Sequence, residues 1–201
     1  MIKKSFSWLW VNFPQRDRID NGSSFGEYVA AVRLAGGIVK PIALQDLTID
    51  LESCLDAITE NTKLVFICNP NNPTGTLIEA EKINDFMERV PGHVLVIYDE
   101  AYGEYIADTT YPNGIDWVKQ GKNVIVLRTF SKVYSLAGLR VGYAVANDAL
   151  ADYMGRVRQV FNVNGIAQAA ALATLGDKEY FNTKHFPSWG LVISLLRRTS
   201  Y

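Results

Sequence analysis

The sequence is poor in cysteine and has no excess of charge of one sign. Cys54 and Cys68 are its only cysteines, and two thiols at this spacing suit neither a disulfide framework nor a metal site. We therefore expect both to be buried thiols in a reducing, cytoplasmic compartment. The 20 basic residues balance 21 acidic ones, so no strong field would attract nucleic acid or an anionic membrane. We exclude both as partners and assign no metal ligand.

Long hydrophobic runs are also missing, since none approaches the roughly 20 apolar residues that a transmembrane helix needs. The segment 1–13 begins with lysines and an aromatic run, as a signal peptide might. Polar residues interrupt it and no small-residue cleavage site follows, so we do not expect one. A soluble protein is expected, and 201 residues with 48% hydrophobic content suffice for one α/β domain with a sizeable core.

Short apolar strands alternate with amphipathic helices from Phe25 onward. We predict strands at 38–44, 64–68, 94–98, 124–127 and 142–146. We predict helices at 26–35, 50–58, 83–90, 115–120, 149–161 and 166–175. Strands that are apolar at consecutive positions are typical of parallel sheets covered on both faces. The pattern therefore predicts a doubly wound, mostly parallel α/β sheet.

One strand of this sheet leads into a turn that contains a lysine. Residues 128–132 read RTFSK, and Arg140 follows eight residues after Lys132. Ligands of open parallel sheets bind at the carboxyl ends of the strands. Two hydroxyls, an arginine and an amine that can form a Schiff base would suit pyridoxal phosphate. Taken alone, the turn is equally compatible with an ordinary surface connection.

Residues 128–143 resemble the lysine segment of the fold-type I pyridoxal-phosphate aminotransferases, and most closely that of the histidinol-phosphate aminotransferases. In that family a Thr-x-Ser-Lys turn and the following Leu-Ala-Gly-Leu-Arg-x-Gly-Tyr supply the cofactor lysine and phosphate ligands. The resemblance implies that Lys132 forms the Schiff base and that Ser131 and Arg140 bind the cofactor phosphate. It implies a helping role for Thr129.

Two further turns, each directly after an expected strand, resemble motifs of the same family. The first is NPNNPTG at 69–75, in which the resemblance implies that Asn72 meets the phenolic oxygen of the cofactor. The second is DEAY, in which it implies that Asp99 keeps the pyridine nitrogen protonated and that Tyr102 contacts the phenolic oxygen. Adjacent side chains on an extended segment point to opposite faces, so Asp99 and Glu100 are not expected to flank one scissile bond.

The aromatic residue Phe25 resembles the family position that stacks on the cofactor ring, and Tyr28 is a second candidate. The resemblance covers about residues 25–180. We therefore expect a divergent segment at 1–24, a partial large domain at 25–180 and an atypical tail at 181–201. The small domain would be absent and the large domain incomplete at both ends.

The activity implied by the resemblance is transamination. Lys132 would move a proton at the substrate carbon, with histidinol phosphate as amino donor and 2-oxoglutarate as acceptor, in histidine biosynthesis. Full-length relatives would be cytoplasmic homodimers. Three alternatives stay open at this point: another class I/II aminotransferase, a threonine-phosphate decarboxylase, and an inactive remnant that keeps the cofactor residues.

Overall fold

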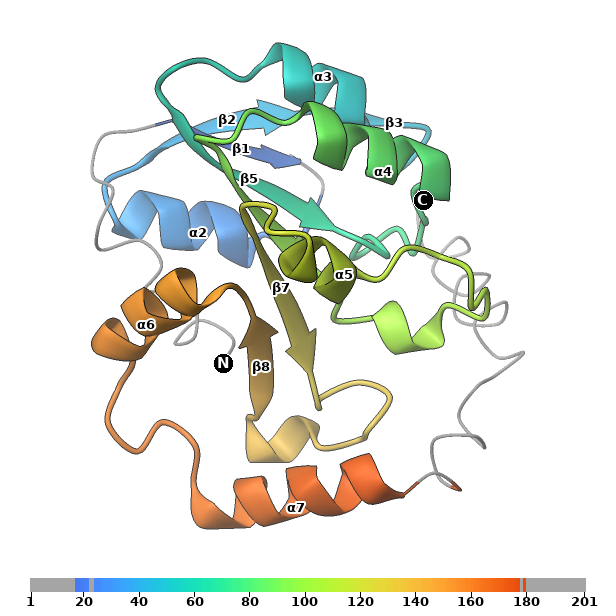
Figure 1. The fold of residues 1–201 in the computed structure, drawn as a ribbon, viewed down its shortest axis with the longest axis vertical. Helices are drawn as coiled ribbons and strands as arrows, with labels where there is room; N and C mark the ends of the chain where they lie inside the picture. Colours follow the sequence, from blue (N-terminus) through green and yellow to red (C-terminus); the bar gives the residue numbers. More distant parts are fainter. Residues whose placement is uncertain (1–16, 22–23, 178, 180–201) are drawn as a thin grey trace, which may run out of the picture.

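A computed structural model describes residues 17–21, 24–177 and 179 of the chain (Figure 1). Its centre is a six-stranded sheet in the order β2-β1-β5-β6-β7-β8. The strands are β1 (Asp17–Asn21), β2 (Ile38–Ile42), β5 (Thr62–Cys68), β6 (Leu95–Asp99), β7 (Val124–Thr129) and β8 (Gly142–Val145). The first five in this order are mutually parallel, and only β8 runs antiparallel to its neighbour β7. The predicted α/β fold with a mostly parallel sheet is confirmed.

Helices cover both faces of the sheet (Figure 1). Residues of α2 (Glu27–Leu34) and α6 (Asp148–Val157) pack on one face. The opposite face is covered by α3 (Leu51–Asp56), α4 (Ala80–Arg89) and α5 (Gly114–Lys119). The helix α7 (Gly165–Gly176) lies beyond the sheet and packs on the connection between β7 and β8. A small hairpin of β3 (Leu44–Gln45) and β4 (Thr48–Ile49) follows β2. None of the described helices is long and apolar enough to cross a membrane.

The central strands send alternate side chains to the two faces, because successive residues of a strand point in opposite directions. In β5, Val65 and Ile67 belong to the core under α3, α4 and α5, whereas Leu64 and Phe66 belong to the core under α2. All four are at most 1% exposed. Both faces of the sheet are thus shielded from solvent at β5, as the consecutive apolar residues predicted. The two cysteines are buried free thiols, as expected.

The strand β1 was not predicted from the sequence. It lies in the interior of the sheet, with β2 on one side and β5 on the other. Its sequence DRIDN has one apolar residue, Ile19, which is 0% exposed and joins the core under α3 and α4. A strand of this composition shows neither an apolar run nor an alternation, so periodicity gives no signal for it.

Helix ends follow local chemistry. Asp50 accepts a hydrogen bond from the backbone N–H of Ser53 at 3.1 Å and caps α3, as predicted. After α2 the chain turns at Gly36, whose φ of +70° is a conformation that glycine adopts at little cost. These local signals set the start of α3 and the end of α2, two helices that cover opposite faces of the sheet.

The central position of Ile67 leads to a stability prediction. Replacing Ile67 by alanine leaves a cavity between β5 and its covering helices, and should lower the free energy of unfolding by about 2–5 kcal/mol. The matched change Leu34→Ala removes a side chain that is 88% exposed and should cost less than about 0.5 kcal/mol. Urea denaturation measures both, and equal losses would show that β5 is not at the centre of the core.

Candidate functional site

The structure brings the three polar turns to one edge of the sheet. They leave the carboxyl ends of β5, β6 and β7, which are neighbours in that order. The register pairs Cys68 with Asp99 and Asp99 with Leu127, so the three strands end almost level with one another. This edge is where open parallel sheets bind their ligands.

Asp99 is a buried carboxylate at the middle of this edge. It is 6% exposed and accepts a 2.5 Å hydrogen bond from Tyr28 Oη and a 3.0 Å bond from the backbone N–H of Ala101. Burial raises the pKa of Asp99, while the bond from Tyr28, the Ala101 N–H and the nearby Lys132 amine oppose the rise. The carboxylate is therefore held by specific donors at a place where charge is costly.

Lys132 and Tyr102, each predicted to contact the cofactor, lie close to each other although they come from two different turns. The Nζ atom of Lys132 lies 4.8 Å from the centroid of the Tyr102 ring. The Lys132 side chain is half-buried, as is Tyr102. Tyr102 begins the short 3₁₀ helix η1 (Gly103–Tyr105). The amine is thus positioned over an aromatic face and is still open to a ligand.

The two predicted phosphate ligands, Ser131 and Arg140, and the predicted helper Thr129 lie in and just before the connection from β7 to β8. Thr129 ends β7, is buried, and accepts a 3.1 Å hydrogen bond from the backbone N–H of Ser131. Nη1 of Arg140 lies 3.5 Å from Ser131 Oγ and also donates to the carbonyl of Ala137. Arg140 is exposed and has a left-handed backbone, with φ of 56°. The turn therefore places a hydroxyl and a guanidinium side by side.

In the turn after β5, two asparagines donate their side-chain amides to other residues of the protein. Asn69 donates to the hydroxyls of Tyr98 and Tyr111 at 2.8 and 2.6 Å. Asn71 donates to Thr74 Oγ1 at 2.8 Å. Asn72 is half-buried, and among the described residues its side-chain amide has no hydrogen-bond partner. Its amide is consequently the one in this turn that is available to a ligand.

The two aromatic candidates on α2 differ in exposure. Tyr28 is 1% exposed, stacks on Phe66 with ring centroids 4.9 Å apart and donates a hydrogen bond from its hydroxyl to Asp99. Its ring cannot also cover a ligand. Phe25 is half-buried and meets the Tyr28 ring edge-on at 5.4 Å. Phe25 remains the candidate for stacking, and Tyr28 is instead the partner of Asp99.

Glu100 forms an ion pair that the sequence did not reveal. It is 4% exposed and accepts bonds from Arg128 Nε at 2.7 Å and from the backbone N–H of Gly114 at 2.9 Å. It points to the α5 side of the sheet, away from Asp99, as strand geometry predicted. The alternation along β6 could have indicated its direction, but nothing in the sequence indicated its partners.

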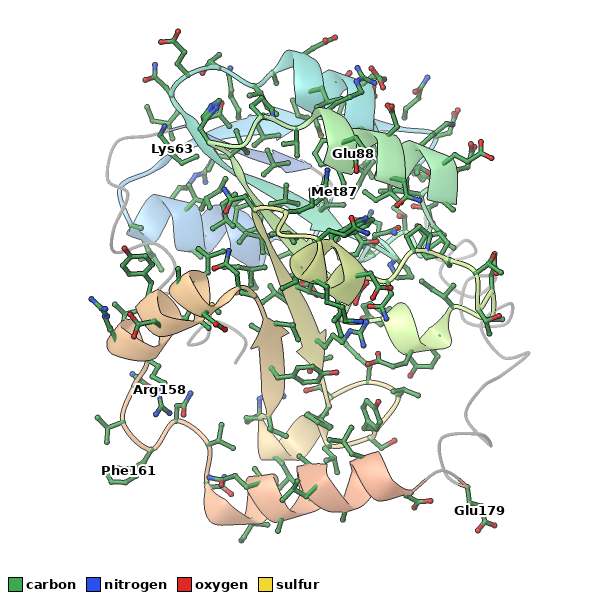
Figure 2. The ribbon with its side chains drawn as sticks, in the orientation of Figure 1. Lys63, Met87, Glu88, Arg158, Phe161 and Glu179 are labelled. Carbon is green, nitrogen blue, oxygen red and sulfur yellow. The ribbon has the colours of Figure 1, made fainter. Side chains whose placement is uncertain are left out.

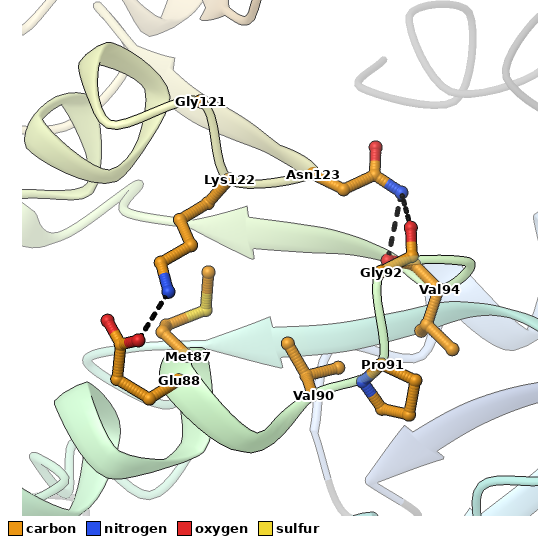
Figure 3. Close-up of a pocket in the computed structure, with 9 residues that line it drawn as sticks. All are labelled: Met87, Glu88, Val90, Pro91, Gly92, Val94, Gly121, Lys122 and Asn123. Atoms are coloured by element: carbon orange, nitrogen blue, oxygen red, sulfur yellow. Dashed lines mark hydrogen bonds and ion pairs between the residues drawn. The ribbon is translucent and has the colours of Figure 1, made fainter.

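The cavity drawn in Figure 3 has a volume of about 300 Å³ and lies at the opposite end of the sheet. Its lining includes Val94 and Asn123, which precede β6 and β7, and Asn123 Nδ2 donates to the carbonyl of Val94 at 3.0 Å. An ion pair of 2.7 Å between Lys122 and Glu88 borders it. Figure 2 shows Met87 and Glu88 on α4. This cavity is separate from the strand ends that bear the predicted residues.

No cluster of three potential metal ligands occurs in the described part of the chain.

Known proteins resemble this chain in sequence and fold. A histidinol-phosphate aminotransferase of Caldicellulosiruptor saccharolyticus is 46% identical over 89% of this chain and 50% of its own length. An aromatic amino acid aminotransferase of Mycolicibacterium smegmatis is 49% identical over 76% of this chain and 42% of its own. The crystal structure of histidinol-phosphate aminotransferase from Sinorhizobium meliloti in complex with pyridoxal-5'-phosphate superposes with a TM-score of 0.85 at 31% identity, over 92% of this chain and 50% of that one.

These matches agree on the family. The chain spans about half the length of the curated relatives it matches. The family described as "Aminotransferase class I and II" matches residues 19–186, which is most of the chain. Pyridoxal phosphate is the cofactor of this family, and a solved relative contains it. On these grounds the chain belongs to the class I and II aminotransferases.

Proposed function

We propose that the protein transfers the amino group of histidinol phosphate to 2-oxoglutarate with pyridoxal phosphate as cofactor. The observation that supports this most directly is the position of the Lys132 amine, 4.8 Å above the Tyr102 ring, at the sheet edge where Asp99 is buried. An amine, a phenol and a buried carboxylate at one strand edge form a set suited to an imine-forming cofactor.

The residues present fit the cofactor in chemistry. The carboxylate of Asp99 would pair with the protonated ring nitrogen, which a buried acceptor favours. Asn72 and Tyr102 would donate to the phenolic oxygen. Ser131 and Arg140 would bind the phosphate, with Thr129 holding the Ser131 backbone in place. These roles are argued from the donor set, and Phe25 would contribute its ring face.

When bound, the cofactor supplies an electron sink for the negative charge that develops at the substrate Cα. The chain's own part is to position and move protons. The Lys132 amine would take the proton from that carbon and return it, as a general base and acid does. Tyr28 would keep Asp99 ionised by its 2.5 Å hydrogen bond, which opposes the effect of burial.

The choice of donor rests on similarity. Several relatives at 41–48% identity are named histidinol-phosphate aminotransferases. A second candidate activity, transamination of aromatic amino acids, is favoured by the Mycolicibacterium relative at 49% identity. Both donors have an unsaturated ring, so both would require an apolar surface beside the cofactor.

The first test is formation of glutamate from 2-oxoglutarate with each donor in turn. We expect histidinol phosphate to be preferred over aromatic amino acids. The change Lys132→Ala should lower the rate by about 10²–10⁴-fold because the general base is lost. The control Lys82→Ala removes an exposed lysine of α4 and should change the rate little.

Preference for an aromatic donor would assign the second activity, and full activity of Lys132→Ala would refute the site. Cofactor binding without turnover of either donor would indicate a remnant.

The second test concerns the bond from Tyr28 to Asp99. Tyr28→Phe keeps the ring that stacks on Phe66 but removes the donor, so the pKa of Asp99 should rise further. A raised carboxyl pKa stabilises the fold at low pH, and that stability is lost as the pH rises through the pKa of the folded state. The variant should therefore lose more stability at pH 8 than at pH 5. The loss at pH 8 should be about 1.5–3 kcal/mol.

Urea denaturation at the two pH values measures this difference. Tyr153→Phe is the matched control, since Tyr153 is 57% exposed. A Tyr28→Phe variant whose loss of stability is the same at pH 5 and pH 8 would contradict the claim that the Tyr28 bond holds down the pKa of Asp99.

A further inference from the structure

Glu104 is a carboxyl group that the proposed reaction does not use. It lies in η1, two residues after Tyr102. Both of its carboxyl oxygens are buried, and neither has a hydrogen-bond partner among the described residues. Burial raises the pKa of Glu104, and its own backbone N–H opposes the rise without cancelling it. A buried carboxylate without a partner is costly, so the protein must either pair it or keep it protonated.

The cation that acts on Glu104, Arg128, is already paired with another carboxylate. Arg128 donates to Glu100 from Nε at 2.7 Å and from Nη2 at 2.6 Å, and Nη2 also donates to Asn113 at 2.9 Å. Glu100 in turn accepts from the backbone of Gly114. These bonds tie the end of β6, the end of β7 and the start of α5 together. We call Glu100, Arg128, Asn113 and Gly114 the strand-end clamp.

The helix η1 is packed directly on this clamp. The N–H of Gly103 donates to the carbonyl of Glu100 at 2.9 Å, and the N–H of Tyr105 donates to the carbonyl of Tyr102 at 3.1 Å. A Cβ atom placed on Gly103 would lie 3.1 Å from that of Glu100. The position of Tyr102 beneath the Lys132 amine therefore depends on where the clamp holds Glu100.

Burial favours the neutral form of Glu104, and the charges around it only partly oppose this. The titratable groups that face it come from the loop after β6 (Glu100), from β7 (Arg128) and from the turn after β7 (Tyr134). One guanidinium faces two carboxyl groups and neutralises only one of them. Burial, opposed by Arg128 and aided by Glu100, raises the pKa of Glu104 to about 7. Burial and Glu104 likewise raise the pKa of the Tyr134 hydroxyl to about 12, so Tyr134 stays neutral here.

We propose that Glu104 is a positioning residue that acts through its proton. In the protonated form it leaves Arg128 bonded to Glu100, so the clamp holds η1 and Tyr102 against the Lys132 turn. When it loses the proton it competes with Glu100 for Arg128 and loosens η1. The part of this inference that concerns Lys132 rests on the proposed function.

The test compares the protein with Glu104→Gln, which mimics the protonated side chain at every pH. Glu60→Gln is the control, since Glu60 is an exposed loop residue. Melting temperatures are measured at pH 6 and pH 8.5 without cofactor. Between pH 6 and pH 8.5 the melting temperatures of the unmodified protein and of the control should fall by about 4 °C more than that of Glu104→Gln. Only these two proteins lose the Glu104 proton in the folded state over this range. Equal losses in all three proteins would overturn the proposal.

A direct titration covers the case in which Glu104→Gln fails to fold. The ¹³C resonance of the Glu104 carboxyl, assigned through its backbone in the unmodified protein, should titrate near the expected pKa of about 7. Titration near about 4.3, as for an ordinary glutamate, would refute a retained proton.

Pyridoxal phosphate affinity at the same two pH values then tests the link to the site. The affinity of the unmodified protein should fall more between pH 6 and pH 8.5 than that of Glu104→Gln. Parallel pH profiles would refute the positioning role. If the unmodified protein binds no cofactor at either pH, the proposed function fails, while the melting and titration results still decide whether Glu104 holds its proton.

Discussion

The hydrogen bond from Tyr28 to Asp99 is the interaction on which the arrangement of the site depends. Asp99 ends the central strand β6, where both faces of the sheet are covered and a bare carboxylate would be costly. Tyr28 reaches it from α2 across 71 residues of sequence. The bond thus fixes α2 to the edge of the sheet and places Phe25, three residues earlier, beside the same edge.

Parallel strands explain why three separate turns can form one site. The carboxyl ends of β5, β6 and β7 lie together, so the side chains of Asn72, Asp99 and Lys132 share one edge although 60 residues separate the first from the last. The face under α2 receives Asp99, and the face under α5 receives Glu100. The same alternation therefore places one carboxylate at the candidate site and the next in the strand-end clamp.

The sequence predicted those parts of the structure that depend on local pattern. Strands β5, β6 and β7 could be predicted because consecutive apolar residues mark strands with two covered faces. The strand β1 could not, because DRIDN has one apolar residue and its pairing comes from neighbours far along the chain. The hydrogen bond of Tyr28 and the proposed role of Glu104 were not predictable for the same reason. Tyr28 depends on a contact with Asp99, and Glu104 depends on the pairing of Arg128 with Glu100.

The measurement that tests the central claim most directly is chemical trapping of the cofactor. The protein is incubated with pyridoxal phosphate, reduced with borohydride, digested and mapped by mass spectrometry. We expect a single stable adduct on Lys132, because its amine lies at the strand edge with Tyr102 beneath it, in the turn where the Arg140 side chain lies next to Ser131. An adduct on another lysine, with Lys132 unmodified, would contradict the assignment of this edge as the cofactor site.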